Sequence, residues 1–319
     1  MSTEPTLEDR FVGCLLGLAV GDALGAHFEG QPVAFMERKY RSARQLIHSP
    51  PPGELWYTDD TQMAIGVAET LVRCGEVDFD VLCERFAANF LPQRGYGRGA
   101  RIVLEAMGAG HDHKYLAENL FPGGSFGNGA AMRVAPVGVM FRDDPSAVWK
   151  QAHTSALPTH VHPLGIEGAQ VLALAVALAS QGEELNRESY FETLAERCGA
   201  PEYSGALRRA ARLDTVRDLG LFGNGIEATA SVVTAIAAFG LTPDSYGETI
   251  GNAILLGGDT DTIAAMAGAI SGAYLGVGAI PSDLLAKLED RKQGKSYIEQ
   301  LARDLYGAYE AARGLPTKD

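Results

Sequence analysis

Apolar side chains recur along most of this chain at intervals of three and four residues, which places them on one face of a helix. Phe11, Leu15 and Leu18 form one such stripe within residues 7–29. The same spacing predicts further helices over residues 61–74, 81–90, 100–107, 146–154, 166–181, 187–198, 204–213, 226–239, 245–255 and 262–275. The alternation typical of half-buried strands is nearly absent, and no heptad repeat persists. The pattern therefore predicts an all-α fold that is not a coiled coil.

Proline and glycine are scattered through the 319 residues and do not gather into a linker, and no internal repeat is visible. We therefore expect a single compact multi-helix domain over residues 1–319, with a core from about residue 8 to about residue 312. Residues 31–56 contain several prolines and glycines. This stretch is expected to form a loop with one short helical turn.

Glycines fall at every fourth position of the first predicted helix, at Gly13, Gly17, Gly21 and Gly25. Residues four apart lie on one face of a helix, so these glycines form a ridge without side chains. Such a ridge allows a second backbone to approach closely. Because glycine weakens an isolated helix, we expect tight packing at this face to compensate.

The net charge of -13 argues against sequence-independent binding of nucleic acid, which requires clustered lysine and arginine. The N-terminus is polar and acidic and does not resemble a signal peptide, so a cytoplasmic location is expected. Residues 263–280 carry no formal charge and approach the length of a membrane span. Their alanine and glycine content, and the aspartates directly before them, favour a buried helix, and no membrane association is expected.

Two dense clusters of oxygen ligands open predicted helices, Thr58-Asp59-Asp60-Thr61 and Asp259-Thr260-Asp261-Thr262. Each cluster taken alone is also consistent with an ordinary helix cap followed by acidic first-turn residues. One oxygen suffices for a cap, however, and adjacent carboxylates raise one another's pKa unless a cation lies between them. We therefore hypothesise that the clusters meet around hard divalent cations, and two Mg²⁺ ions would balance the four aspartates.

The glycine-rich stretch 121–129, FPGGSFGNG, is a second candidate for ligand binding. Its backbone amides could hold a phosphate and Phe126 could stack on a base, although a plain connecting loop is an equally good interpretation. The stretch lacks the Lys-Ser/Thr ending of a phosphate-binding loop of nucleotide triphosphatases. The histidine pairs at 111/113 and 160/162 lack zinc-site spacing, so His160 is interpreted as a substrate-loop or helix-entry residue.

An ordered set of short motifs resembles the ADP-ribosylglycohydrolase family. The motifs are Gly21-Asp22-Ala23-Leu24-Gly25 with Glu29, Tyr57 to Thr61, Gly95 to Gly99, Ser125 to Arg133, Thr159-His160 and Gly257 to Thr262. The resemblance covers nearly the whole chain and implies an all-helical fold with a binuclear Mg²⁺ centre in a cleft, where Mn²⁺ may substitute. The implied metal ligands are Thr58, Asp59, Asp60, Asp259, Asp261 and Thr262. The implied catalytic residues are Glu29, Asp60 and Asp261.

The resemblance also implies a set of substrate contacts. They are Gly95, Gly97, Phe121, Gly124, Ser125, Phe126, Gly127, Asn128 and His160. Family members usually carry Tyr at the position of Phe126, so stacking on adenine is kept here but the hydroxyl is lost. The implied partners are ADP-ribose and ADP-ribosylated proteins, and the chain is expected to be a monomer.

The implied activity is hydrolysis of the glycosidic bond at the anomeric carbon of the distal ribose in ADP-ribosylated side chains. The Gly95-Tyr96-Gly97 turn and Glu29 favour the ADP-ribosylhydrolase 3 type, which acts on O-linked substrates such as ADP-ribosyl serine, poly(ADP-ribose) and O-acetyl-ADP-ribose. Three alternatives stay open: an ADP-ribosyl-arginine hydrolase, a non-catalytic ADP-ribose-binding or crystallin-like protein, and a metal-dependent phosphohydrolase.

Overall fold

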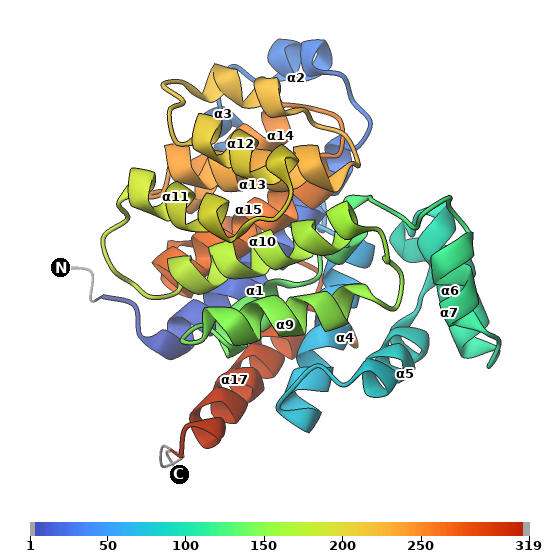
Figure 1. Ribbon diagram of the computed structural model, residues 1–319. Helices are drawn as coiled ribbons and strands as arrows, with labels where there is room; N and C mark the ends of the chain where they lie inside the picture. The colour runs from blue at the N-terminus through green and yellow to red at the C-terminus, as the bar shows by residue number, and fades with distance from the viewer. Residues whose placement is uncertain (1–3, 315–319) are drawn as a thin grey trace.

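The computed structural model describes residues 4–314, and within that range every regular element is a helix (Figure 1). Only two isolated bridges, Leu55 with Leu288 and Gly127 with Glu227, pair extended backbone among these residues. The all-α prediction is confirmed. The buried apolar side chains of the described elements form one continuous core.

The helices follow one another along the chain with short connections. Their bounds are α1 Leu7–Gly25, α2 Val33–Lys39, α3 Ala43–His48, α4 Asp59–Cys74, α5 Phe79–Asn89, α6 Arg98–Gly108, α7 His113–Asn119, α8 Ala135–Met140, α9 Pro145–Ala156, α10 Pro163–Ala179, α11 Arg187–Arg197, α12 Pro201–Ala210, α13 Ala228–Leu241, α14 Tyr246–Leu255, α15 Thr260–Leu275, α16 Ser282–Lys287 and α17 Lys295–Ala312. Short 3-10 turns lie at Ala26–Phe28, Pro92–Arg94, Asn128–Ala130, Val216–Phe222 and Val277–Ala279.

The glycine ridge of α1 packs directly on the backbone of α15, as the sequence predicted, and both helices lie in the middle of the fold (Figure 1). A Cβ added at Gly17 would lie 2.4 Å from the carbonyl oxygen of Gly268, and one added at Gly21 would lie 2.2 Å from that of Ala264. The contact runs antiparallel, from Gly13 beside Gly272 to Gly25 beside Thr260. It therefore brings the C-terminal end of α1 next to the first turn of α15.

We expect Gly17→Ala to destabilise the protein by roughly 1–3 kcal/mol, because its methyl group would collide with backbone that cannot move independently. Gly307→Ala is the matched control, since Gly307 lies within α17 and a Cβ there would meet nothing within 4 Å. That substitution should stabilise by about 0.5–1 kcal/mol. Urea unfolding of both variants measures the difference, and equal stabilities would show that the ridge is not tightly packed in solution.

The loop prediction for residues 31–56 was wrong, because two short helices form there. Pro32 stands at the N-cap of α2, where its missing N–H costs nothing, and the Ser42 side chain accepts from Gln45 N to cap α3. The predicted helix over 226–239 begins at Ala228, since the carbonyl of Ile226 accepts from Asn128 N and so belongs to a loop. The sequence interpretation had assigned no element to α7, α8, α16 or α17.

One helical stretch within residues 4–314, Leu7–Phe28, is long and apolar enough to cross a membrane by length and composition, with a mean hydropathy of 1.6. In the fold 89% of its apolar window is buried against other helices, which is also typical of a central core helix. Of the uncharged segment 263–280, residues 263–275 lie in α15 and are buried through Ala273, as expected. The expectation of a buried helix does not hold for the rest of the segment, because α15 ends at Leu275 and the short Val277–Ala279 turn that follows has no buried residue.

Candidate active site

Asp22, near the end of α1, fixes the start of α4. Its carboxylate is fully buried and accepts hydrogen bonds from the backbone N–H and the hydroxyl of both Thr58 and Thr61. The bonds from Thr58 measure 3.0 Å from nitrogen and 2.8 Å from oxygen. The Thr58 hydroxyl also accepts from Asp60 N, so one of its lone pairs is left available for another ligand. Asp22 was noted in the sequence only as part of a motif, and its role there had not been recognised.

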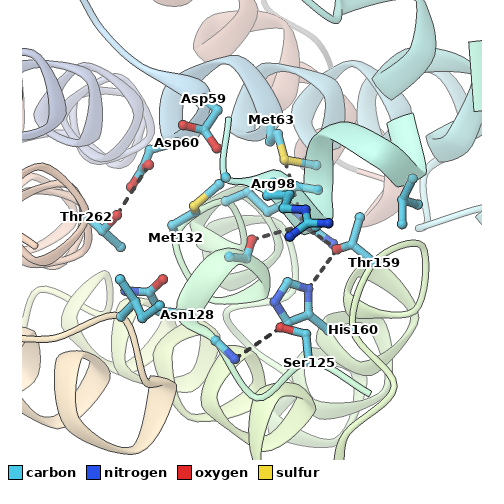
Figure 2. Close-up of a pocket in the computed structure, with 18 of the residues that line it drawn as sticks. Asp59, Asp60, Met63, Arg98, Ser125, Asn128, Met132, Thr159, His160 and Thr262 are labelled. Carbon is cyan, nitrogen blue, oxygen red and sulfur yellow. Dashed lines mark hydrogen bonds between the residues drawn. The ribbon is translucent and has the colours of Figure 1, made fainter. Parts of the chain in front are cut away.

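The two aspartate clusters meet, as the sequence hypothesis required. The Thr262 hydroxyl donates to Oδ2 of Asp60 at 3.4 Å, across the junction of α15 and α4 (Figure 2). Asp60 is 2% exposed and Asp261 is 5% exposed. Among the described residues, Oδ1 of each is buried without a hydrogen-bond partner. Buried carboxylate oxygens normally accept hydrogen bonds, so these two oxygens without a partner are suited to coordinate a hard cation.

Helix capping does not explain why so many aspartates stand at the starts of α4 and α15. Thr58 caps α4 through its own hydroxyl, which accepts from Asp60 N, so the neighbouring carboxylates are not needed there. Asp259 occupies the N-cap of α15 but makes no side-chain capping bond. Its Oδ2 instead accepts from the Asn128 amide at 2.5 Å. The carboxylates are therefore not used as caps of α4 or α15.

A glycine pair holds Glu29 beside the second cluster. Gly30 N donates to the carbonyl of Gly258 at 2.8 Å, and Gly258 N donates to the carbonyl of Gln31 at 2.9 Å. Gly257 and Gly258 both have positive φ, and a Cβ on Gly257 would lie 2.3 Å from that Gln31 oxygen. As a result the carboxylates of Glu29, Asp259 and Asp261 offer oxygens within 4.8 Å of one another, a separation that one metal ion could bridge.

Burial dominates the electrostatics of these carboxylates. It raises the pKa of Asp59 to about 7, that of Asp259 to about 6 and that of Asp261 to about 9. Burial likewise raises the pKa of Asp60 well above its ordinary value, and the charges of Asp22 and Asp261 add to the effect. Without a cation the cluster holds protons that exposed aspartates would have lost, so the site favours binding of positive charge.

The clusters form one end of a cavity of about 390 Å³. Of the residues that the sequence singled out, those lining the cavity are Glu29, Asp59, Asp60, Gly95, Gly97, Phe121, Ser125, Gly127, Asn128, His160, Asp259, Asp261 and Thr262. Figure 2 shows Ser125, Asn128, Thr159 and His160 across the cleft from Asp59 and Asp60. The structure therefore gathers most of the predicted site residues around one space.

Three of the predicted site residues do not line this cavity. The Thr58 hydroxyl donates to Asp22, and Gly124 is buried against residues 161–162. Phe126 is 48% exposed and packs against the His162 ring at a centroid distance of 5.5 Å. The exposed Ile226, which the sequence had placed inside a helix, lines the cavity in a loop that is hydrogen-bonded to the Phe126 segment.

A buried arginine organises the floor of the cavity. The Arg133 guanidinium is 1% exposed and donates to Thr159 Oγ1 at 2.9 Å and to the carbonyl of Gly129 at 2.9 Å. Thr159 in turn is 2.7 Å from Nδ1 of His160. Burial, together with the Arg133 charge, lowers the pKa of His160 to about 3. His160 is therefore neutral at physiological pH and acts as a polar wall rather than as a cation.

Similarity to known proteins extends over almost the whole chain. The sequence profile of the ADP-ribosylglycohydrolase family matches residues 3–314. The chain belongs to the ADP-ribosylglycohydrolase family. This result confirms the resemblance carried by the motifs, and it makes the protein an enzyme of a family of glycosidic-bond hydrolases.

Several relatives match over most of their length. The ADP-ribosylhydrolase ARH3 of Xenopus tropicalis is 36% identical, covering 92% of this chain and 94% of that protein. Human ADP-ribosylhydrolase ARH3 is 34% identical, with 94% of each chain covered. The ADP-ribosyl-dinitrogen reductase glycohydrolase of Rhodospirillum rubrum is 27% identical over 90% of this chain and 92% of its own. A solved structure described as an ADP-ribosylglycohydrolase-related protein complex has a TM-score of 0.72 and 31% identity, covering 95% and 99%.

The raised pKa values of these carboxylates predict that the metal-free protein becomes less stable as the pH rises. Asp59, Asp259 and Asp261 each have a folded-state pKa above the unfolded value of 3.8, so the folded state binds more protons between about pH 4 and about pH 9. Stability should fall as the pH rises through that window. We expect the melting temperature in EDTA to decrease from pH 5 to pH 9, and the difference between Mg²⁺ and EDTA to widen. A constant difference would contradict the linkage.

Proposed function

We propose that this protein is a Mg²⁺-dependent ADP-ribosyl hydrolase that cleaves the glycosidic bond at the anomeric carbon of the distal ribose. The proposed substrates are O-linked, namely ADP-ribosyl serine, poly(ADP-ribose) and O-acetyl-ADP-ribose. The Gly95-Tyr96-Gly97 turn and Glu29, which resemble the ADP-ribosylhydrolase 3 type, support the O-linked class, and the 36% identity to an ADP-ribosylhydrolase ARH3 is consistent with that type. We further propose that it acts as a monomeric cytoplasmic domain comprising residues 1–319.

One observation carries the metal dependence, the pair of orphaned oxygens on Asp60 and Asp261 at the junction of α4 and α15. The donor set consists of carboxylates and threonine hydroxyls, which are the ligands that Mg²⁺ prefers and that Mn²⁺ also accepts. The residues that would hold two ions are Thr58, Asp59, Asp60, Asp259, Asp261 and Thr262. When bound, the ions would supply positive charge that orients ribose hydroxyls and stabilises the departing oxygen.

The protein's own residues supply the other parts of the reaction. Cleavage at the anomeric carbon develops positive charge on the ribose, which the surrounding carboxylates stabilise. Glu29 is exposed to the cavity and lies with Asp259 and Asp261 at one end of it. We assign Glu29 the transfer of a proton, either from the attacking water or to the leaving oxygen.

The opposite wall of the cavity is proposed to bind the rest of ADP-ribose. Ser125 and Gly127 lie in the loop before the Asn128–Ala130 turn and Asn128 begins that turn, so that backbone and side-chain donors suit the diphosphate and its ribose. Phe121 lines the cavity and Phe126 stands exposed nearby, so both aromatic faces are accessible to adenine. Gly95 and Gly97 present backbone without side chains to the cavity, and Gly95 lies beside Asp59.

A panel of serine-linked, arginine-linked and poly(ADP-ribose) substrates, each with Mg²⁺ or EDTA, tests this function. We expect ADP-ribose release from the O-linked substrates in Mg²⁺, little release from ADP-ribosyl arginine, and loss of activity in EDTA. Equal release in EDTA would overturn the metal dependence. Preferential release from ADP-ribosyl arginine would overturn the linkage. Binding of ADP-ribose without release from any substrate would support the non-catalytic alternative instead.

A further inference from the structure

A buried ion pair joins the two loops that border Asp59, although neither of its members touches the cavity. Glu289 follows α16 and lies 195 positions after Arg94 in the chain. The side chain of Glu289 is 1% exposed and that of Arg94 is 12% exposed. Removing one partner of such a pair strands the other charge in a site without solvent, so the two side chains depend strongly on each other.

Glu289 first fixes the segment that leads into the metal-binding cluster. Its Oε1 accepts from the backbone N–H of Tyr57 at 3.2 Å, one residue before Thr58. The backbone reinforces the contact, since Glu289 N donates to the carbonyl of Leu55 at 3.0 Å. The Tyr57 hydroxyl donates to the carbonyl of Gln293 at 3.0 Å. The approach to Thr58 is therefore fastened to residues 287–293 and not only to its own helix.

Arg94 fastens the second loop to the same carboxylate. Its Nη2 donates to Oε2 of Glu289 at 3.1 Å, and its Nη1 donates to the carbonyl of Tyr57 at 2.7 Å. The guanidinium also lies 3.7 Å from the centroid of the Tyr57 ring. The next residue is Gly95, whose φ is 93°, and a Cβ built there would lie 3.7 Å from Oδ1 of Asp59. The two terminal nitrogens of the Arg94 guanidinium thus hold the Gly95 turn at a fixed distance from Asp59.

We propose that Glu289 is a positioning residue of the active site, which acts through Arg94 and Tyr57 to hold Asp59 and the Gly95 turn in register. This inference rests on the proposed function, because Asp59 is one of the proposed metal ligands. Outer residues that orient metal ligands typically change metal affinity by about 10- to 100-fold when they are removed. Glu289 does not reach the reacting atoms, so its loss should weaken metal binding and leave the chemistry intact once metal is saturating.

The test compares metal binding and turnover in the full-length chain. Glu289→Ala, stripped of metal and titrated calorimetrically with MgCl₂, should bind roughly 10- to 100-fold more weakly than wild type. Its kcat on an ADP-ribosyl-serine peptide should return to near the wild-type value in excess Mg²⁺. Glu289→Gln keeps an oxygen for Tyr57 N and should recover part of the affinity. Glu192→Ala, which removes a surface pair with Arg208 whose members are 45% and 46% exposed, should change neither quantity.

Folded Glu289→Ala with wild-type Mg²⁺ affinity would overturn the positioning role, as would a kcat loss that excess Mg²⁺ does not restore. If the alanine variant does not fold, Arg94→Lys provides the same test, because lysine keeps the charge but lacks the planar fork that bonds the Tyr57 carbonyl and both carboxylate oxygens of Glu289 at once. Wild-type affinity in Arg94→Lys would then overturn the inference. A wild-type protein that binds no Mg²⁺ would overturn the proposed metal centre itself, and the positioning role with it.

Discussion

We expect Glu29→Gln to bind ADP-ribose nearly as well as the wild-type protein and to turn over substrate about 10²- to 10⁴-fold more slowly. Glutamine keeps the size of the side chain and its hydrogen-bonding capacity, so the cavity retains its shape. It cannot accept or deliver the proton that the reaction moves. Calorimetric titration with ADP-ribose and release from an ADP-ribosyl-serine peptide separate the two effects.

The matched control for this variant is Glu37→Gln, which makes the same change on the exposed side of α2. It should leave both binding and turnover unchanged. Turnover near the wild-type value in Glu29→Gln would remove Glu29 from the proton-transfer role. A parallel loss of ADP-ribose affinity would instead indicate that Glu29 acts mainly in binding.

The parts of the fold that follow from local chemistry were predictable from the sequence. The four-residue spacing of glycines in α1 predicted a close contact with another backbone, and α15 makes that contact. Surplus oxygens at two helix starts likewise indicated that those starts meet, and the bond between Thr262 and Asp60 joins them. In both cases the sequence shows a feature that is unfavourable in an isolated helix, glycines in one and surplus carboxylates in the other. Such a feature indicates that another part of the chain packs against it.

Features that depend on distant partners were not predictable in this way. A single Asp22 in an apolar helix gives no sign that it will accept bonds from Thr58 and Thr61, 36 and 39 positions later. The ion pair of Arg94 and Glu289 could not be predicted from the sequence either, because each residue alone resembles an ordinary surface charge. Pro32 favoured a loop in the sequence interpretation, but proline also occurs at helix starts, and here it stands at the N-cap of α2.

Asp261→Asn should have opposite effects on stability and on function. Burial raises the pKa of Asp261 to about 9, and the charges of Asp259 and Glu29 add to the shift. At neutral pH the folded state therefore holds a proton that the unfolded chain releases, which costs stability that grows with pH up to about 9. Asparagine carries no such proton. In EDTA at pH 8 the variant should be more stable than wild type by at least about 1 kcal/mol, or roughly 2 °C in melting temperature.

The same substitution should abolish the response to metal. Asp261→Asn replaces a charged ligand whose Oδ1 has no other partner in residues 4–314, so Mg²⁺ should no longer raise the melting temperature. Turnover should fall roughly 10³-fold or more, because several kcal/mol of transition-state stabilisation depend on the cation. Asp304→Asn, at an exposed position of α17, is the control and should retain the wild-type responses. If Asp261→Asn were less stable than wild type in EDTA while Mg²⁺ still stabilised it, Asp261 would be a structural residue and the cation would be held without it.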